Sequence, residues 1–305
     1  MQIKIIIDTD IGEDIDDILV TGFALNSPEF EVMGITTVAG DTEARSRITR
    51  QVTRTFGKPE VPVAAGYAHA MPRGDREARP GAGVRQGELA PDETGLPPGC
   101  ELGADEFIAK AAAEHPGEVY VLTIGAMTNV GQALVRFPET AHKLRAVVTN
   151  GGVFGPRETA IGWNLRYDPL AAAVVARAGV EWVLLPENAT RFASLREEEE
   201  QRLRESPLPK AKLLVRAIDL WRKNKPDATK WPHLSDLNVF GYLLGTWLEV
   251  TRGRAILRIP PDRTAQLEVE YDREGPHLLG GELSRERGAE LRELFMERIL
   301  GPSRR

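Results

Sequence analysis

Short, continuous apolar runs alternate with segments of helical period along most of the chain. Runs of this kind, without a strict apolar–polar alternation, are typical of strands covered on both faces. We expect strands at Ile3–Ile7, Glu31–Val38, Val61–Ala64, Glu118–Thr123, Arg145–Thr149 and Glu181–Leu185. We expect helices between them at Asp17–Asn26, Thr42–Phe56, Ala104–Glu114, Asn129–Arg136 and Pro169–Ala178. This order predicts an α/β fold with a doubly wound, mostly parallel, open sheet of Rossmann-like type.

The later part of the chain is more helical. We expect helices at Leu195–Glu205, Lys210–Lys223, Leu237–Val250 and Ser284–Leu300, and short strands near Ala255–Ile259 and Thr264–Val269. The sequence contains no internal repeat and no clean linker. Residues 1–305 are therefore expected to form a single domain with extra C-terminal helices.

One segment, residues 67–103, interrupts this order because it is rich in Gly and Pro and has no clear period. Loops of this length in a compact domain are usually functional or disordered. Two interpretations stay open, a mobile surface insertion and a flap over an active site.

Composition narrows the possible partners and location. The chain has 305 residues, a formal net charge of −6 and one cysteine, Cys100. The acidic balance argues against a basic nucleic-acid-binding surface, and one cysteine cannot form an intrachain disulfide. No signal-peptide pattern and no apolar stretch of roughly 18 residues is present. We therefore expect a cytoplasmic protein without a membrane or nucleic-acid partner.

A dense acidic cluster follows the first expected strand. Its members are Asp8, Asp10, Glu13, Asp14, Asp16 and Asp17. Carboxylates this close must be protonated, solvated or neutralised by a cation, and their hard oxygens suit Ca²⁺ or Mg²⁺. An acidic helix start explains Asp16 and Asp17 adequately. It does not explain Asp8 and Asp10, which lie at the carboxyl end of a strand, where open α/β sheets bind ligands. The cluster therefore predicts a metal or catalytic site.

Two other known chemistries also use aspartates clustered in this way. An EF-hand loop counted from Asp8 needs Gly at its sixth position, but Gly12 comes one place early and a strand precedes the loop. A phosphotransferase of the haloacid dehalogenase type also begins with strand–Asp–x–Asp, although it expects Thr or Val where Gly12 stands. A Mg²⁺-dependent phosphohydrolase with Asp8 as nucleophile is therefore kept as the alternative enzyme.

The acidic stretch DTDIGEDIDD at residues 8–17 resembles the signature of the nucleoside hydrolases, the inosine–uridine-preferring family. Further resemblances follow in the family's order. They are GITTVAGD (34–41), VPVAAG (61–66), LTIGAMTNV (122–130), NGGVFG (150–155), WNLRYDPLAA (163–172) and LSDLNVFGYLL (234–244). Any one motif is weak, but several in register are specific.

The resemblance implies a role for each matching position. Asp10 would be a Ca²⁺ ligand and the general base, with Asp17, the Ile124 carbonyl and Asp236 completing the metal ligands. Asp16 and Asn164 would bind the ribose hydroxyls, and Asp8 would orient its neighbours. Further candidates for substrate binding are Asp41, Asn150, Trp163, Glu158 and His233. Asp10, Asp41, Ile124 and Asn150 all follow expected strands, so they are expected along one edge of the sheet.

Several positions depart from the family pattern. Asp41 replaces the usual Asn. Gly162 stands where many members have a Glu that reaches the 5′-hydroxyl, so this contact is missing, comes from Glu158, or marks a changed sugar end. Ser235 replaces the His associated with protonation of the leaving group, and APDETGL at residues 90–96 lacks the His of the family's HGxxGL loop. These departures predict a leaving group that differs from that of inosine–uridine enzymes, or one that is activated differently.

We therefore expect a Ca²⁺-dependent enzyme of nucleoside salvage that hydrolyses ribonucleosides to ribose and free base. The alternatives are the Mg²⁺ phosphohydrolase and a catalytically silent ribose- or nucleoside-binding protein. The resemblance also implies a homodimer or homotetramer. The base specificity stays open.

Overall fold

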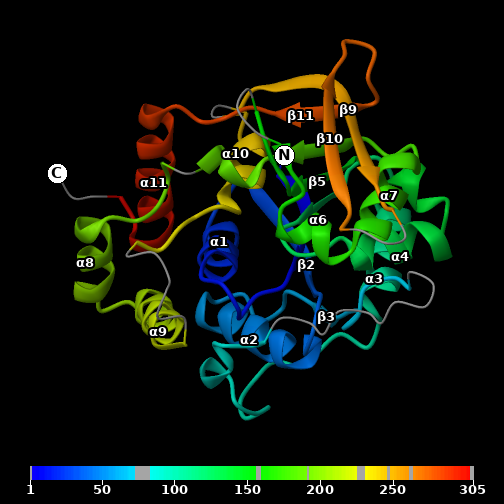
Figure 1. The fold of residues 1–305 in the computed structure, drawn as a ribbon. Coiled ribbons are helices and arrows are strands. Elements are labelled where there is room, and N and C mark those ends of the chain that lie inside the picture. Colours follow the sequence, from blue (N-terminus) through cyan, green and yellow to red (C-terminus); the bar gives the residue numbers. More distant parts are fainter. Residues whose placement is uncertain are drawn as a thin grey trace.

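A nine-stranded sheet, with helices on both faces, forms the centre of the computed structural model, which describes residues 2–72, 83–155, 159–190, 192–224, 231–245, 248–260 and 264–302 (Figure 1). The strands of this sheet are β1 (Ile3–Thr9), β2 (Phe30–Thr37), β3 (Val63–Ala65), β4 (Tyr120–Thr123), β5 (Ala146–Asn150), β8 (Trp182–Leu185), β9 (Val250–Arg258), β10 (Gln266–Tyr271) and β11 (His277–Gly280). A separate small hairpin pairs β6 (Val153–Phe154) with β7 (Thr159–Ala160).

The helices are distributed along the whole chain. They are α1 (Asp16–Leu25), α2 (Thr42–Thr55), α3 (Ala104–Glu114), α4 (Thr128–Arg136), α5 (Thr140–Lys143), α6 (Trp163–Tyr167), α7 (Pro169–Arg177), α8 (Glu197–Glu205), α9 (Pro209–Asn224), α10 (Leu237–Leu243) and α11 (Arg285–Leu300), with short 3₁₀ helices at Gly87–Leu89 and Glu187–Thr190. In the described ranges, no helix combines the length and the apolar character that a membrane crossing requires.

The strand order is β10-β9-β11-β8-β5-β4-β1-β2-β3. From β3 to β11 every neighbouring pair is parallel. Beyond β11 the sheet ends with β9 and β10, and β9 is antiparallel to both β11 and β10. The predicted α/β fold with a mostly parallel sheet is confirmed. The chain leaves β1 toward β2 and β3 and later returns to β4 on the other side of β1. Such a reversal opens a crevice at the carboxyl ends of the strands, and ligands bind there in this class of fold.

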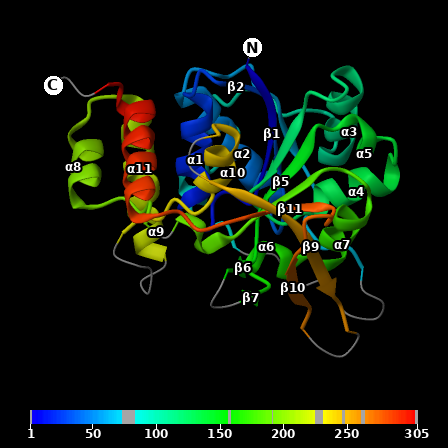
Figure 2. The same cartoon turned by 90° about the horizontal axis from the view of Figure 1, so that it is seen from above.

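Side chains of β1 show how both faces of the sheet are covered. Ile5 and Ile7 belong to a core that includes α1, α2, α9, α10 and α11, whereas Ile6 belongs to the core formed with α3, α4 and α7. All three isoleucines are fully buried. Figure 2 shows these two groups of helices on opposite sides of the sheet. This arrangement explains why the strand reads as a continuous apolar run.

The expected C-terminal helices pack against the first helix. Phe23 of α1 contacts Phe240 of α10 edge-on and stacks on Phe295 of α11, at centroid distances of 5.9 and 6.4 Å. These contacts tie α10 to the crevice, because α10 begins directly after Asp236.

The structure corrects several expectations for the later elements. The helix expected at Leu237–Val250 ends at Leu243, and Gly245 adopts a φ of +74°, a conformation that suits glycine and ends a helix. Val250 instead begins β9, a longer strand than the one expected near 255–259. Strand β11 was not predicted.

Candidate functional site

A cavity of about 370 Å³ opens at the carboxyl edge of the sheet, beside β1. Its lining residues are Asp10, Glu13, Asp14, Asp16, Asp17, Ile124, Asn150, Trp163, Asn164, Glu187, His233, Ser235 and Asp236. They come from the ends of β1, β4, β5 and β8, from the starts of α1 and α6, and from the segment before α10. The reversal of strand order therefore places the acidic cluster where the sequence predicted it.

Asp8 lies within the fold, outside the set of residues that line the cavity. One of its oxygens accepts hydrogen bonds from the Thr36 hydroxyl at 2.6 Å and from the Asn129 amide at 2.7 Å. Its other oxygen is buried and has no hydrogen-bond partner within the described ranges. Burial raises the pKa of Asp8 to about 7. Asp8 can therefore link β1 to its neighbours, as expected for a residue that orients others.

Arg45 of α2 holds the backbone of Asp10 in place through hydrogen bonds. The fully buried guanidinium of Arg45 donates to the carbonyls of Asp10, Ile11 and Ala39. Burial raises the pKa of Asp10 to about 6, and the positive charge of Arg45 opposes this rise. Sequence reasoning missed Arg45, because one arginine in an amphipathic helix gives no signal that its side chain points inward.

Asp10 also depends on a close approach of two strand ends. The α-carbon of Gly125, just after β4, lies so near β1 that a Cβ there would be 2.7 Å from the backbone nitrogen of Asp10. Glycine is the residue that allows this approach. The same turn carries Ile124, which lines the cavity together with Asp10.

Asp16, Asp17 and Asp236 form a compact group, with one oxygen of each lying within 4.8 Å of those of the others. All three side chains are buried. The Thr9 hydroxyl donates to Asp17, and the Asn150 amide donates to Asp236 at 2.6 Å. Burial, followed by repulsion from neighbouring aspartates, raises the pKa of Asp17 and of Asp236 well above the usual range.

This group has the chemistry of a cation site. Buried carboxylates that raise one another's pKa are stabilised by a positive charge between them. The available donors are carboxylate and carbonyl oxygens, the type of ligand preferred by hard ions such as Ca²⁺ and Mg²⁺. Asp10, Asp17, Asp236 and Ile124 line the same cavity, so the residues present fit a divalent ion.

Asn164, at the start of α6, connects the ends of β4 and β5. Its amide donates to the carbonyls of Ile124 at 2.9 Å and of Asn150 at 3.0 Å. Asn150 in turn accepts a hydrogen bond from Asn238 at 2.7 Å while donating to Asp236. These amides fix the orientation of the carbonyls and carboxylates on that side of the cavity.

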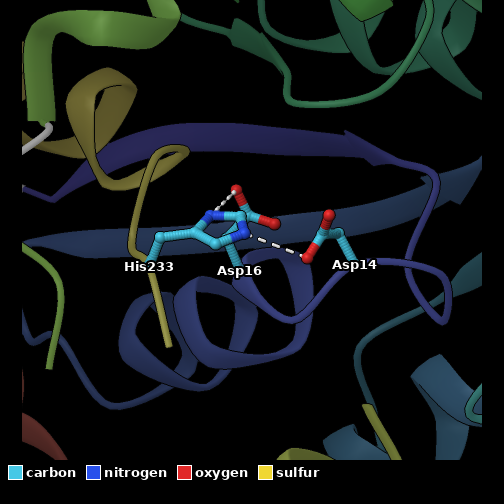
Figure 3. A group of neighbouring side chains, drawn as sticks. All are labelled: Asp14, Asp16 and His233. Carbon is cyan, nitrogen blue, oxygen red and sulfur yellow. Dashed lines mark hydrogen bonds and ion pairs between the residues drawn. The ribbon is translucent and has the colours of Figure 1, made fainter. Parts of the chain in front are cut away.

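His233 lies between two aspartates on the cavity wall (Figure 3). Its Nε2 is 3.0 Å from Asp14, and its Nδ1 is 3.2 Å from Asp16 and 3.1 Å from the Ser235 hydroxyl. Burial lowers the pKa of His233, but the charges and hydrogen bonds of Asp16 and Asp14 outweigh it and raise the pKa to about 10. The ring is therefore an imidazolium at neutral pH.

The remaining residues predicted for substrate binding do not all lie at the cavity. Trp163 lies at the cavity with 43% of its surface exposed, as a rim residue would. Asp41 is exposed and does not belong to the lining; its carboxylate accepts from the amide of Ala44 and caps α2. Glu158 lies outside the described residues. Of the 67–103 loop, Gln86 contacts the acidic turn by donating to the carbonyl of Asp14 at 2.7 Å.

Sequence reasoning also missed Glu187 as a lining residue. The signal was available, because Glu187 follows the expected strand that ends at Leu185, and all parallel strands of the sheet end at the same edge.

The fold and the cavity together define an α/β protein with a carboxylate-rich cavity whose donors fit a cation. Residues 5–289 match the model of the inosine-uridine preferring nucleoside hydrolases, and the chain belongs to this family. Family membership supports hydrolysis of the N-glycosidic bond of ribonucleosides.

Individual relatives agree with this assignment. The chain is 33% identical over 205 residues to uridine nucleosidase 1 of Arabidopsis thaliana, covering 64% of this chain and 60% of that protein's length. It is 29% identical over 238 residues to the pyrimidine-specific ribonucleoside hydrolase RihA of Citrobacter koseri, covering 76% of this chain and 74% of that protein. Among solved structures, a purine-preferring ribonucleoside hydrolase from Gardnerella vaginalis shares the fold, with a TM-score of 0.80, 23% identity and 98% of each chain covered.

Proposed function

We propose that this protein is a Ca²⁺-dependent N-ribohydrolase that converts ribonucleosides to ribose and free base in cytoplasmic nucleoside salvage, as a homodimer or homotetramer. The main support is the convergence of Asp16 and Asp17 with the distant Asp236 at a cavity that Asp10 also lines. Relatives with uridine or pyrimidine in their names make uridine the first substrate to assay.

The residues proposed to hold the ion are Asp10, Asp17, Asp236 and the carbonyl of Ile124. When bound there, Ca²⁺ would offset the repulsion among the carboxylates and lower the pKa of a coordinated water. Asp16 and Asn164 are proposed to bind the ribose hydroxyls, with Asn150 keeping Asp236 in place.

Asp10 is the proposed general base. Its carboxylate accepts a proton from the attacking water as the new C1′–O bond forms and the C1′–N bond breaks. General bases typically contribute about 10²–10⁴-fold in rate, and work best when their pKa is near the working pH. The reaction develops positive charge on the ribose, which the surrounding carboxylates stabilise.

The departing base must gain a proton. Among the described residues that line the cavity, His233 is the one imidazole, and it lies two positions before Ser235, which stands where the family has its His. We therefore include His233 as the residue that hydrogen-bonds or protonates the leaving base. Trp163, at the rim, is a candidate for stacking on the base.

Asp8 bears on the alternative phosphohydrolase. A nucleophile must reach the substrate, but Asp8 lies outside the cavity lining and its hydrogen-bonded oxygen is held by Thr36 and Asn129. This position favours the glycosidase over the Mg²⁺-dependent phosphohydrolase.

The test is release of reducing sugar from uridine, cytidine and inosine by the purified protein, with Ca²⁺ and with a chelator. We expect turnover that is lost on chelation and falls by at least about 10²-fold in Asp10→Asn. Calorimetry with ribose separates the silent-binding alternative, which predicts tight binding without turnover. Phosphate release from a phosphomonoester, with no sugar released from any ribonucleoside, would overturn the proposal.

A further inference from the structure

Glu187 is a cavity carboxylate that does not belong to the acidic group around Asp17. It enters from the segment that follows β8, on the same side as Trp163. Its carboxylate accepts a hydrogen bond from the backbone amide of Trp163 at 3.1 Å, and its own amide donates to the Gly152 carbonyl at 2.8 Å. The backbone of Glu187 is thus fixed to Gly152, just before β6, and its carboxylate to the start of α6.

Gly162 makes room for this carboxylate. A Cβ at Gly162 would overlap Oε1 of Glu187 and lie 2.6 Å from the backbone nitrogen of Gly152. Gly162 also has a φ of +52°, which glycine adopts readily. The carboxylate of Glu187 therefore occupies the volume into which any side chain at position 162 would extend.

The other acidic side chains of the cavity have contacts or proposed roles elsewhere, and Asp10 is the proposed base. Asp14 and Asp16 contact His233, Glu13 lies 3.9 Å from Arg85, and Asp17 and Asp236 belong to the group suited to a cation. Glu187 contributes a carboxylate held by backbone amides and not included in that group. Burial, opposed by the Trp163 and Gly152 hydrogen bonds, raises the pKa of Glu187 to about 7. A hydroxyl group of a ligand could donate a hydrogen bond to the ionised carboxylate of Glu187 and stabilise it.

We propose that Glu187 binds the 5′-hydroxyl of the ribonucleoside and thereby selects nucleosides over 5′-deoxynucleosides and nucleoside 5′-phosphates. This inference rests on the proposed function. Ribose offers a vicinal pair of hydroxyls, assigned to Asp16, Asn164 and the ion, and one primary hydroxyl, which needs a separate acceptor. A carboxylate accepts a hydrogen bond from that hydroxyl, whereas it repels a phosphate at the same place.

The carboxylate of Glu187 comes from a different segment of the chain than a Glu at position 162 would. There, the acid would come from the segment that leads into α6; here, it comes from the end of β8 and reaches the same volume through the space that Gly162 leaves. Substitution of either residue should therefore disturb the same contact.

The experiment compares kcat/KM for uridine and 5′-deoxyuridine in the wild type, Glu187→Leu and the control Glu282→Gln, which removes an exposed carboxylate outside the cavity lining. We expect the wild type and the control to prefer uridine by about 10–100-fold, the value of a hydrogen bond to a charged group. Glu187→Leu should bring the ratio close to 1, mostly through uridine. Uridine 5′-monophosphate should be a poor substrate of the wild type and should improve relative to uridine in Glu187→Leu.

The ratio of two substrates within one variant cancels a general loss of folded enzyme. A merely structural role for Glu187 predicts equal losses with uridine and 5′-deoxyuridine, and that result would overturn the inference. Gly162→Ala should reduce the preference in the wild-type background and have no further effect on it in Glu187→Leu. If the effects of Gly162→Ala and Glu187→Leu on the preference were additive, the two positions would not act on the same contact.

A binding measurement separates this inference from the proposed function. Calorimetry with ribose and 5-deoxyribose, in the presence of Ca²⁺, reports the same contact without turnover. Sugar release with no 5′-preference refutes the role of Glu187 alone. No sugar release from any ribonucleoside refutes the hydrolase, while a preference for ribose that disappears in Glu187→Leu would still assign the contact.

Discussion

Arg45 donates hydrogen bonds to the backbone carbonyls of Asp10 and Ile11, so a buried cation supports the turn that carries the proposed base. Replacing Arg45 by Met keeps much of the volume but leaves buried carbonyls without donors. Each such group costs about 1–3 kcal/mol. We expect Arg45→Met to lower the melting temperature of the purified protein clearly.

Exposed Arg54→Met, on the same helix, is the matched control and should change the melting temperature little. The loss of positive charge should also raise the pKa of Asp10, since Arg45 lowers it. In the active enzyme, the acid limb of the pH–rate profile should move to higher pH. An unchanged melting temperature and an unchanged profile would contradict a supporting role for Arg45.

Asn150 fixes Asp236 by donating to it at 2.6 Å. Loss of a group that orients a metal ligand typically lowers metal affinity about 10–100-fold. We expect Asn150→Ala to weaken Ca²⁺ binding by this factor in calorimetry. Asn26→Ala, at the end of α1 and outside the cavity lining, should bind Ca²⁺ as the wild type does. Equal affinities for all three proteins would refute the role of Asn150 in holding Asp236 as a metal ligand.

The raised pKa values of the buried carboxylates predict that the stability of the metal-free protein depends on pH. Burial raises the pKa of Asp8 to about 7 and of Asp10 to about 6, above the usual value of 3.8. The folded state therefore binds more protons than the unfolded state between about pH 4 and 7, and stability decreases as pH rises through this range. In the presence of a chelator, we expect a higher melting temperature at pH 5 than at pH 8.

Adding Ca²⁺ should raise the melting temperature more at pH 8 than at pH 5, because the carboxylates that bind it are then charged. Equal stabilisation at both pH values would argue against a buried carboxylate site.

His233 predicts a second pH effect. Its pKa is raised from 6.5 to about 10, so its contribution to stability is complete below pH 6.5 and is lost as pH rises through 10. We expect His233→Gln to lower the melting temperature at pH 6 and to have much less effect at pH 10.5. A difference of the same size at both pH values would show that the ion pairs with Asp14 and Asp16 do not stabilise the fold.

The sequence predicted the parallel sheet, because buried strands leave strong local patterns. Clustered carboxylates marked the acidic turn after β1, whereas the place of the distant Asp236 beside it was implied only by the resemblance to the nucleoside hydrolases. Contacts that depend on three-dimensional packing were not predicted. Gly162 showed that a side chain was missing, yet nothing near it in sequence indicated that Glu187 fills the space. The helix expected at Leu237–Val250 was too long, since apolar residues continue past the turn at Gly245 into β9.

The position of Asp41 illustrates a similar limit. Its place after a strand was read correctly, but the side chain turns back to cap α2 instead of entering the cavity. Its role in substrate binding stays a prediction. Capping and ligand binding require the same polar residue types at the same strand end, so residue type alone cannot distinguish them.

Asp17 is synthesised early and Asp236 late, because more than two hundred residues separate them in the sequence. The ribosome releases the first strand and its aspartates long before the segment that carries Asp236, so a nascent chain holds an incomplete set of oxygens until most of the polypeptide has emerged. Calcium capture would then coincide with the final stage of folding, and truncated products would have carboxylates but no tightly bound ion.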